Sequence, residues 1–391
     1  MSVSQKSSPR CALICGPYLS GKTTLFEALL AEAGALQPHS SPNSPFVLGD
    51  SSPEARAHSM STEMNVASAE YLGESWTFLD CPGSVELLQE TRNAMCVADI
   101  AVVVVEPNPD KAITLATYLK LLDDLSVPHI VFINKFDKKN VSVRALMEAF
   151  QSATEKPLLL REIPIRDGED VIGHVDLVSE RAYHWEENKP SVLMSLPEKL
   201  VEREAEARTE LFENLADFDD ELLEKLLEDV VPTSQEIYAN LATDLANNLV
   251  VPVFFGSATH GNGIRSLMKA RRHEAPHMAA TAARLGMSDG DATQVRIFKT
   301  IHAGHAGKLS IGRVMCGTLA SGDLLNKERP ASINRIFGRK LEAVNQATTG
   351  DIVGLTKLDD ARTGDTLTPQ GKAEDEGFSS PERHSGVEGK K

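Results

Sequence analysis

The chain has 391 residues, of which 41% are hydrophobic and 25% charged, so it can form the cores of two or three ordinary globular domains. Its 40 lysines and arginines against 56 aspartates and glutamates give a formal net charge of −16, which opposes binding to free nucleic acid. The longest apolar run, 249–255, is too short to span a bilayer, and residues 1–10 lead into no secretory signal. We therefore expect a cytosolic protein without membrane association.

The first part of the chain alternates strand-like and helix-like segments. Residues 10–16 form an apolar run that ends in glycine, and the residues after it have the apolar spacing of a helix. Further strand-like runs lie at 76–80, 99–107, 128–134 and 249–258. This alternation predicts an α/β domain with a parallel-rich sheet, helices on both faces and ligands at the carboxyl ends of the strands. The Pro- and Ser-rich stretch 38–59 is expected to be mobile unless a ligand orders it.

Residues 156–249 interrupt this alternation and are expected to be a helical insertion within the first domain. A small strand-like portion comes first, and acidic helices follow it. Residues 198–229 contain 13 acidic and four basic side chains. We interpret this charge as a solvated helical face, and a docking surface for a basic partner is the less favoured alternative.

The composition of the chain changes from about residue 293. Apolar and polar residues then alternate between glycine turns, which predicts short strands in a small antiparallel β-barrel. The last residues are polar and almost free of aliphatic side chains, which is typical of disorder. We therefore expect a first domain over 1–285, a barrel over 286–368 and a disordered tail over 369–391.

Residues 16–23, GPYLSGKT, match the phosphate-loop pattern GxxxxGK[ST] between a predicted strand and a predicted helix. The glycines let backbone N–H groups surround phosphates, and the positive end of the helix points at them. Lys22 would reach the β and γ phosphates, and the Thr23 hydroxyl would hold Mg²⁺.

Two further motifs follow strand-like runs. Residues 80–83 form DxxG, in which Asp80 would hold Mg²⁺, usually through water, while the Gly83 N–H faces the γ-phosphate. Alone, DxxG is a common turn, but its place after a strand beside the phosphate loop supports the functional interpretation. Residues 134–137 form NKxD, in which Asp137 would accept hydrogen bonds from guanine N1–H and the 2-amino group.

The remaining base contacts complete a predicted GTP site. Asn134 would tie the base loop to the phosphate loop, and the stem of Lys135 would cover the ring. A backbone N–H at Ser257 or Ala258, after the last strand, would reach guanine O6. Asn134 and Asp137 argue against an ATP-using phosphotransferase with the same phosphate loop.

Other candidate residues are interpreted as structural. His302 and His305 have HxxH spacing, but no third ligand lies near them in the sequence, so surface histidines are favoured over a metal site. The five cysteines form no CxxC pair, which suits a reducing compartment. Cys11 and Cys15 are expected to fill the core of the sheet.

With these motifs, the chain resembles the translational GTPases, most closely elongation factor G and the elongation factor G-like group. The resemblance extends over about residues 10–368 and includes INKFDK, FFGSA, GKLSIGRV and GDTL. It implies a P-loop GTPase domain with a helical insertion, then a β-barrel domain that in the family contacts the ribosome. GTP or GDP and Mg²⁺ are the implied ligands, and a monomer that acts at or near the ribosome is the implied state.

The resemblance also aligns HSMST at 58–62 with the switch segment in which a Thr contacts Mg²⁺. Ser61 falls at that place, and Thr62 is the neighbouring alternative. The predicted nucleotide contacts are therefore Gly16, Ser20, Gly21, Lys22, Thr23, Thr24, Asp80, Gly83, Asn134, Lys135, Asp137, Ser257 and Ala258, and the predicted magnesium ligands are Thr23, Ser61 and Asp80.

The chain departs from the family in two ways. Ser84 stands where members that hydrolyse GTP rapidly carry His, and losing such a group commonly costs about 10² to 10⁴ in rate. Full members also continue into further domains, so this chain by itself should not move tRNA and mRNA. Our leading hypothesis is a slow, Mg²⁺-dependent GTPase of the elongation factor G type. The alternative is a GTP-dependent ribosome-binding module, or a truncated product, without useful catalysis.

Overall fold

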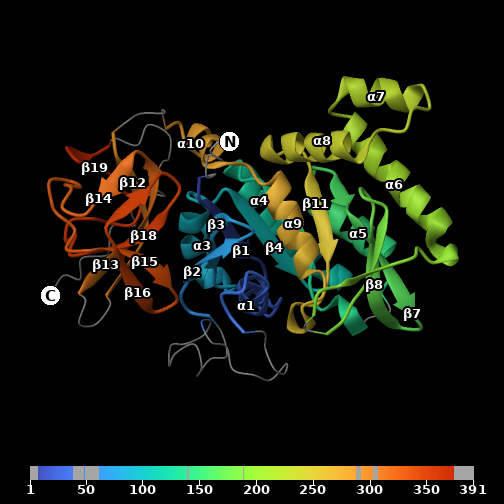
Figure 1. Ribbon diagram of the computed structural model, residues 1–391, viewed down its shortest axis with the longest axis horizontal. Helices are drawn as coiled ribbons and strands as arrows, with labels where there is room; N and C mark the ends of the chain where they lie inside the picture. Colours follow the sequence, from blue (N-terminus) through green and yellow to red (C-terminus); the bar gives the residue numbers. More distant parts are fainter. Residues whose placement is uncertain are drawn as a thin grey trace, which may run out of the picture. The chain divides into compact units, whose positions relative to one another are not determined.

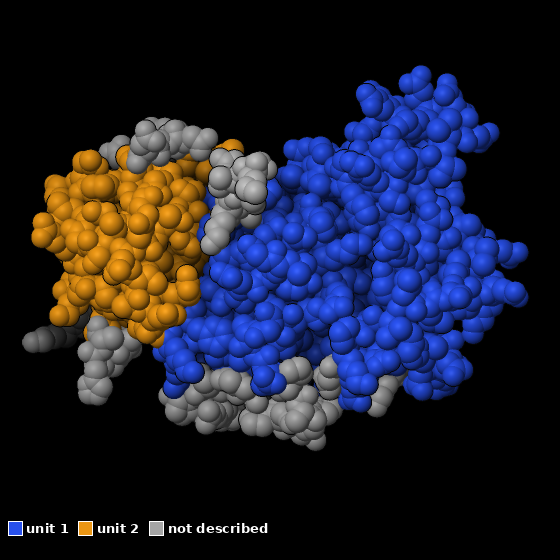
Figure 2. Space-filling view, in the orientation of Figure 1, with its two compact units in different colours: residues 1–280, 336–340 blue, residues 281–335, 341–391 orange. Residues whose placement is uncertain are grey.

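The computed structural model describes residues 8–37, 48, 61–138, 141–187, 189–287, 292–302 and 307–373. Apart from residue 48, the stretch 38–59 lies outside these ranges, as do His305 and the tail beyond 373. The chain forms two compact units, residues 1–280 with 336–340 and residues 281–335 with 341–391, which Figure 2 colours separately. No helix within the described ranges has the length and apolar character needed to cross a membrane.

The first unit is built on a mixed sheet with strand order β2-β3-β1-β4-β5-β11-β6. Figure 1 labels β1, β2, β3, β4 and β11 of this sheet. Only β2 runs antiparallel to its neighbour, and the other pairs are parallel. The strands are β1 (Arg10–Cys15), β2 (Asn65–Tyr71), β3 (Glu74–Asp80), β4 (Ile100–Val105), β5 (His129–Ile133), β6 (Leu158–Leu160) and β11 (Val251–Phe255). The predicted parallel-rich sheet is therefore confirmed.

Helices cover this sheet because its central strands are apolar on both faces. Every residue of β4, IAVVVV, is buried, as expected for a strand covered on two sides. The helices of this layer are α1 (Lys22–Glu32), α3 (Leu88–Met95), α4 (Ala112–Asp124), α5 (Val143–Gln151) and α9 (Ile264–Glu274). Leu25 and Leu29 of α1 share one core with Leu267 of α9 and with Ile14 and Phe78 of the sheet. Cys11 and Cys15 are fully buried in β1, as predicted.

The segment 156–249 begins with β6, which belongs to the central sheet, and then forms a separate structure. A four-stranded antiparallel sheet has the order β10-β9-β8-β7. Its strands are β7 (Glu162–Asp167), β8 (Asp170–Asp176), β9 (Arg181–His184) and β10 (Val192–Met194), and helices α6 (Val201–Ala216), α7 (Asp220–Leu227) and α8 (Ser234–Ala246) follow. Apolar side chains of these helices, among them Leu211, Leu215 and Leu241, pack on Ile163 and Val175 of the small sheet.

The second unit consists mainly of antiparallel strands, as predicted for a barrel domain. Strand β12 pairs with β13 and β19, and β13 and β15 pair with β18. The strands are β12 (Gln294–His302), β13 (Lys308–Cys316), β14 (Thr318–Ala320), β15 (Ile333–Phe337), β16 (Lys340–Val344), β17 (Gln346–Thr348), β18 (Ile352–Thr356), β19 (Thr366–Thr368) and β20 (Gly371–Lys372), and α10 (Met278–Arg284) precedes them. Val295, Val314 and Leu355 lie in their common core.

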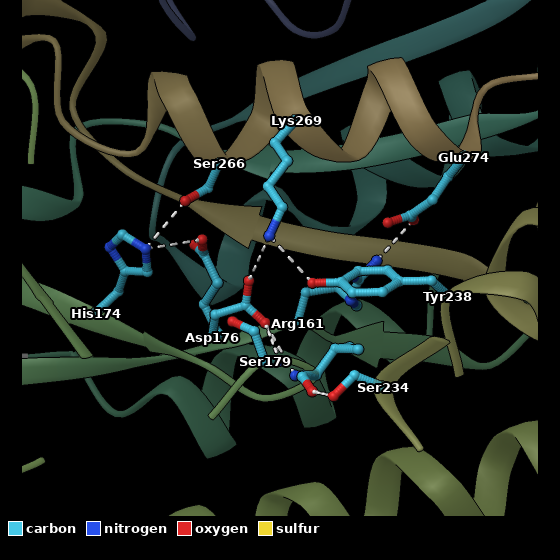
Figure 3. A network of polar contacts seen from close by, with 11 residues as sticks. Arg161, His174, Asp176, Ser179, Ser234, Tyr238, Ser266, Lys269 and Glu274 are labelled. Atoms are coloured by element: carbon cyan, nitrogen blue, oxygen red, sulfur yellow. Dashed lines mark hydrogen bonds and ion pairs between the residues drawn. The ribbon is translucent and has the colours of Figure 1, made fainter. Parts of the chain in front are cut away.

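A buried polar network joins the small sheet to helices α8 and α9 (Figure 3). Arg161 pairs with Glu274 of α9 through Nη1 and Oε2 at 2.7 Å, and both side chains are buried. His174 of β8 lies 3.0 Å from the Ser266 hydroxyl on the same helix. These contacts hold the insertion against α9, and of the four side chains only Ser266 is partly exposed.

Two titratable groups of this network are neutral near pH 7. Burial raises the pKa of Glu162 to about 8, and burial lowers the pKa of His174 to about 4. Their Oε1 and Nε2 atoms are 3.4 Å apart. Because Trp185 Nε1 can only donate, and donates to His174 Nδ1 at 2.8 Å, the imidazole proton is on Nε2.

The raised pKa of Glu162 makes stability depend on pH. In the unfolded chain the Glu162 carboxyl group has its usual pKa of 4.5, so it releases a proton that the folded chain keeps up to a higher pH. The contribution of this group to the free energy of unfolding is therefore complete below pH 4.5 and is lost as pH rises through about 8. We expect Glu162→Gln to raise the free energy of unfolding at pH 8 by on the order of 1 to 3 kcal/mol, with much less gain at pH 5. Urea unfolding at both pH values measures it.

The matched control is Glu202→Gln on α6, where the side chain is exposed. It should show no gain at either pH. Equal gains in the two variants, or a gain for Glu162→Gln that does not grow with pH, would contradict a neutral buried carboxyl group.

Candidate nucleotide-binding site

The phosphate loop connects β1 to α1 at the carboxyl edge of the sheet. Gly21 occupies the position before α1 with φ 90°, and a Cβ added there would lie 2.3 Å from Asn134 Nδ2. Only glycine fits this conformation and this close approach. The first N–H groups of α1 and its positive end therefore point toward the loop, where they can bind an anion. Lys22 is buried, and its Nζ donates to Pro17 O at 2.8 Å.

The DxxG segment lies directly beside the phosphate loop. Strand β3 pairs with β1 so that Asp80 is opposite Ile14, and the Thr23 hydroxyl donates to Asp80 Oδ2 at 3.0 Å. A Cβ added at Gly83 would be 2.3 Å from Lys22 Nζ. The structure therefore brings together the two motifs whose predicted ligands are phosphate and magnesium.

Oxygen atoms from three segments meet at Thr23. Its Oγ1 lies 3.2 Å from Ser61 Oγ and 3.0 Å from Asp80 Oδ2, and Asp80 is fully buried. Hydroxyl and carboxylate oxygens are the donors that Mg²⁺ prefers, so these residues fit a magnesium site. It is the Ser61 hydroxyl, not one from its neighbour Thr62, that makes this contact with Thr23. Asn65, which spacing did not single out, donates to Asp80 Oδ2 at 3.2 Å from β2.

Asn134 joins the loop after β11 to the phosphate loop. Its Nδ2 donates to Ser20 O at 2.9 Å, and its Oδ1 accepts from Ala258 N at 2.9 Å. The side chain is 2% exposed, so it has little access to water. One amide therefore fixes the distance between three of the four motifs.

Lys135 contacts the phosphate loop and the residue that follows β4. It has φ 60°, and its Nζ donates to Leu19 O at 2.7 Å and to Glu106 Oε1 at 2.8 Å. Asp137 lies in the short helix η3 (Phe136–Lys138), and its Oδ2 is 3.3 Å from His260 Nε2. Glu106 and His260 were not found from the sequence, because neither belongs to a motif of fixed spacing.

The loop after β11 holds itself in place with its own backbone. Ser257 N donates to Asn262 O at 3.1 Å, and Asn262 N donates to Ser257 O at 3.0 Å. In this conformation the Ser257 and Ala258 N–H groups, which the sequence assigned to guanine O6, both bind within the protein. Gly16 is the first residue of the phosphate loop, directly after β1, and Thr24 lies within α1.

Ser84 lies between Gly83 and the short helix η1 (Val85–Leu87), with the extended backbone of a helix cap. Tyr118 of α4 donates from its hydroxyl to Gly83 O at 3.3 Å. Burial raises the pKa of Tyr118, so the hydroxyl keeps its proton and remains a donor. Of the HxxH pair, His302 is the last residue of β12, and the described residues contain no metal-binding cluster of three or more His, Cys, Asp or Glu.

The fold and these loops define a P-loop nucleotide-binding domain of the GTPase type. Residues 8–277 match the elongation factor Tu GTP binding domain, and residues 292–370 match elongation factor G domain 2. The chain therefore belongs to the translational GTPases that carry the elongation factor Tu GTP-binding domain.

Relatives of this chain include elongation factors. An elongation factor G-like protein of Synechocystis is 41% identical over 92% of this chain, and elongation factor G of Rhodopseudomonas palustris is 27% identical over 90%. The chain spans 54% of each of these two proteins. A crystal structure of a protein from Thermus thermophilus has a TM-score of 0.82 and 27% identity, and the match covers 96% of this chain and 55% of the other.

The two hydrogen bonds of Asn134 predict a measurable loss of stability. Asn134→Ala leaves the buried Ser20 carbonyl and Ala258 N–H without this partner, so we expect the free energy of unfolding to fall by about 2 kcal/mol or more. Urea unfolding without nucleotide measures it. Asn247→Ala, at an exposed position after α8, is the matched control and should change it by less than about 0.5 kcal/mol. Similar losses in both variants would remove Asn134 from this role.

Proposed function

We propose that this chain binds GTP and GDP with Mg²⁺ through the four converging loops and hydrolyses GTP slowly. The observation that carries the proposal is the Asn134 amide, which joins the phosphate loop to the loop at Ala258, together with the Thr23 contact to Asp80. Side chains suited to phosphate, magnesium and base binding thus lie at one edge of the sheet. Membership in the translational GTPases agrees with a guanine nucleotide as the ligand.

Each group has a distinct role in this proposal. The backbone N–H groups of residues 16–24 and the Lys22 ammonium bind the phosphates, and the Gly83 N–H faces the γ-phosphate. Thr23, Ser61 and Asp80 would hold Mg²⁺, which would neutralise phosphate charge when bound. Asp137 accepts the two donors of the guanine edge. The Ala258 N–H, which donates to Asn134 Oδ1, would also donate to guanine O6 as a three-centre hydrogen bond.

Lys22→Ala should abolish tight nucleotide binding, because it removes the only ammonium group that the phosphate-loop motif supplies. We expect GDP affinity to fall at least about 100-fold. Wild-type affinity for ATP should be lower than that for GTP by at least about 10⁴. Equilibrium binding of fluorescent GDP, with unlabelled GTP and ATP as competitors, measures both.

Lys120→Ala is the matched control, because Lys120 is 78% exposed on α4. It should bind GDP as the wild type does. Comparable competition by ATP and GTP would overturn the guanine assignment, and tight GDP binding by Lys22→Ala would overturn the phosphate site.

We further propose that the chain acts at or near the ribosome with a low rate of hydrolysis. Support for the ribosome comes from its similarity to elongation factor G and its domain 2. Support for slow hydrolysis comes from Ser84, because a short hydroxyl cannot orient water as an imidazole can. The same residue favours a second candidate, a GTP-dependent ribosome-binding module without useful catalysis.

Single-turnover GTP hydrolysis with and without ribosomes tests the assignment of Ser84. We expect less than about tenfold stimulation of the wild type, and a further gain of about 10 to 100 in the stimulated rate of Ser84→His. Ser84→Ala, the matched control, should behave as the wild type. Strong stimulation of the wild type would reject the argument from Ser84.

Co-sedimentation with ribosomes separates the two candidates. The module would bind in the presence of a non-hydrolysable GTP analogue, and less with GDP, while showing no turnover on the ribosome. A slow GTPase would show the same nucleotide-dependent binding followed by measurable phosphate release. Equal sedimentation with both nucleotides, or none with either, would contradict a role at the ribosome.

A further inference from the structure

We propose that His260 is a positioning residue: it orients the Asp137 carboxylate for guanine recognition. Glu187 of the insertion holds His260 in place. This inference rests on the proposed function, because it assigns to Asp137 the guanine edge. It adds a specificity-determining residue outside the four motifs and gives the insertion a part in base recognition.

The His260 ring lies between two carboxylates. Its Nε2 is 3.3 Å from Asp137 Oδ2, and its Nδ1 is 3.0 Å from Glu187 Oε1. Each ring nitrogen thus faces a carboxylate oxygen, one from the NKxD segment and one from the insertion. The ring is 23% exposed and Asp137 is 18% exposed, so the contact between them is partly shielded from water. Such a bridge restricts the rotation of the Asp137 side chain.

The contact leaves room for guanine. A carboxylate has about four lone-pair positions on its two oxygens, and guanine N1–H and the 2-amino group require one on each oxygen. The His260 Nε2 lies 3.3 Å from Oδ2 alone, so both oxygens of Asp137 keep acceptor capacity. A carboxylate that is already oriented loses less entropy on binding than one that rotates freely, so His260 favours the base instead of competing with it.

The backbone holds His260 at a fixed position. It is the last residue of the short helix η5 (Ala258–His260), and its N–H donates to Ser257 O at 3.1 Å. Gly261 follows with φ 73°, and the paired hydrogen bonds between Ser257 and Asn262 close the loop. The loop that reaches guanine and the residue that orients Asp137 therefore form one closed unit.

The insertion holds the other side of the ring through a segment that is itself anchored. Glu187 comes two residues after Trp185, whose Nε1 donates to His174 Nδ1 at 2.8 Å. The Trp185 ring is buried and lies 6.2 Å from the Phe255 ring, edge to face, at the end of β11. His174 in turn contacts Ser266 of α9, as Figure 3 shows. Glu187 is therefore attached to the same elements that carry the base loops.

The discrimination between GDP and inosine diphosphate tests this role. Inosine diphosphate lacks the 2-amino group, so it makes only one of the two hydrogen bonds to Asp137 and depends less on the orientation of both oxygens. We expect His260→Ala to lower GDP affinity about tenfold and inosine diphosphate affinity about twofold, so the ratio of the two affinities falls about fivefold. Competition against fluorescent GDP measures all four constants.

Further variants define the arrangement. His260→Gln keeps a donor toward Asp137 and should restore part of the ratio, and Glu187→Gln should lower the ratio less than His260→Ala does. Asp137→Asn is the reference variant, in which the preference for GDP should disappear. His277→Ala, at an exposed position of the same domain, is the matched control and should leave both affinities unchanged.

The outcomes separate this inference from the proposed function. If the wild type prefers GDP and His260→Ala weakens both nucleotides equally, His260 only supports the loop and the inference is wrong while the GTP site stands. Unchanged affinities, or tighter GDP binding in His260→Ala, would also overturn it. A wild type that binds neither nucleotide would remove the proposed function, and this inference with it. A selective fall in the ratio supports it.

Discussion

The arrangement of the site depends on one buried amide. The Asn134 side chain donates to Ser20 O in the phosphate loop and accepts from Ala258 N in the loop after β11, with almost no exposure to water. The phosphate loop follows β1, Asn134 follows β5 and Ala258 follows β11, and parallel pairing brings the ends of these strands to the same edge of the sheet. The sheet therefore sets the approximate distances between the loops, and the two hydrogen bonds of the Asn134 amide hold the loops at those distances.

Around this amide, tight approaches explain the choice of residue at several positions. Gly21 and Gly83 have no room for a Cβ, because Asn134 Nδ2 and Lys22 Nζ respectively lie 2.3 Å from where it would be. The Thr23 hydroxyl reaches Asp80 only because β1 and β3 are paired in a register that aligns their ends. The glycines of the motifs thus allow the close approaches in the site, and the strand register allows the contact between Thr23 and Asp80.

Much of the fold and the motif residues could be predicted from the sequence, because each motif follows an apolar run and the runs alternate with helices. β6 was harder to assign, because a strand of three residues has no readable period and begins the segment taken as an insertion. Asn65 and Glu106 reach the site through strand register and loop shape, which spacing does not encode. The engagement of the Ala258 N–H with Asn134 also follows from geometry alone.

Strand β6 has a consequence for how the fold tolerates change. The chain leaves the central sheet at β6 and returns at β11, and these two strands are hydrogen-bonded neighbours, with Leu158 opposite Val251. The segment between β6 and β11 is therefore an insertion whose two ends lie on neighbouring strands at the edge of the sheet. Such an insertion can become longer or shorter, or be replaced, over evolution while the other strands keep their pairing. The constraint on its sequence then falls on the few side chains that contact the candidate nucleotide site.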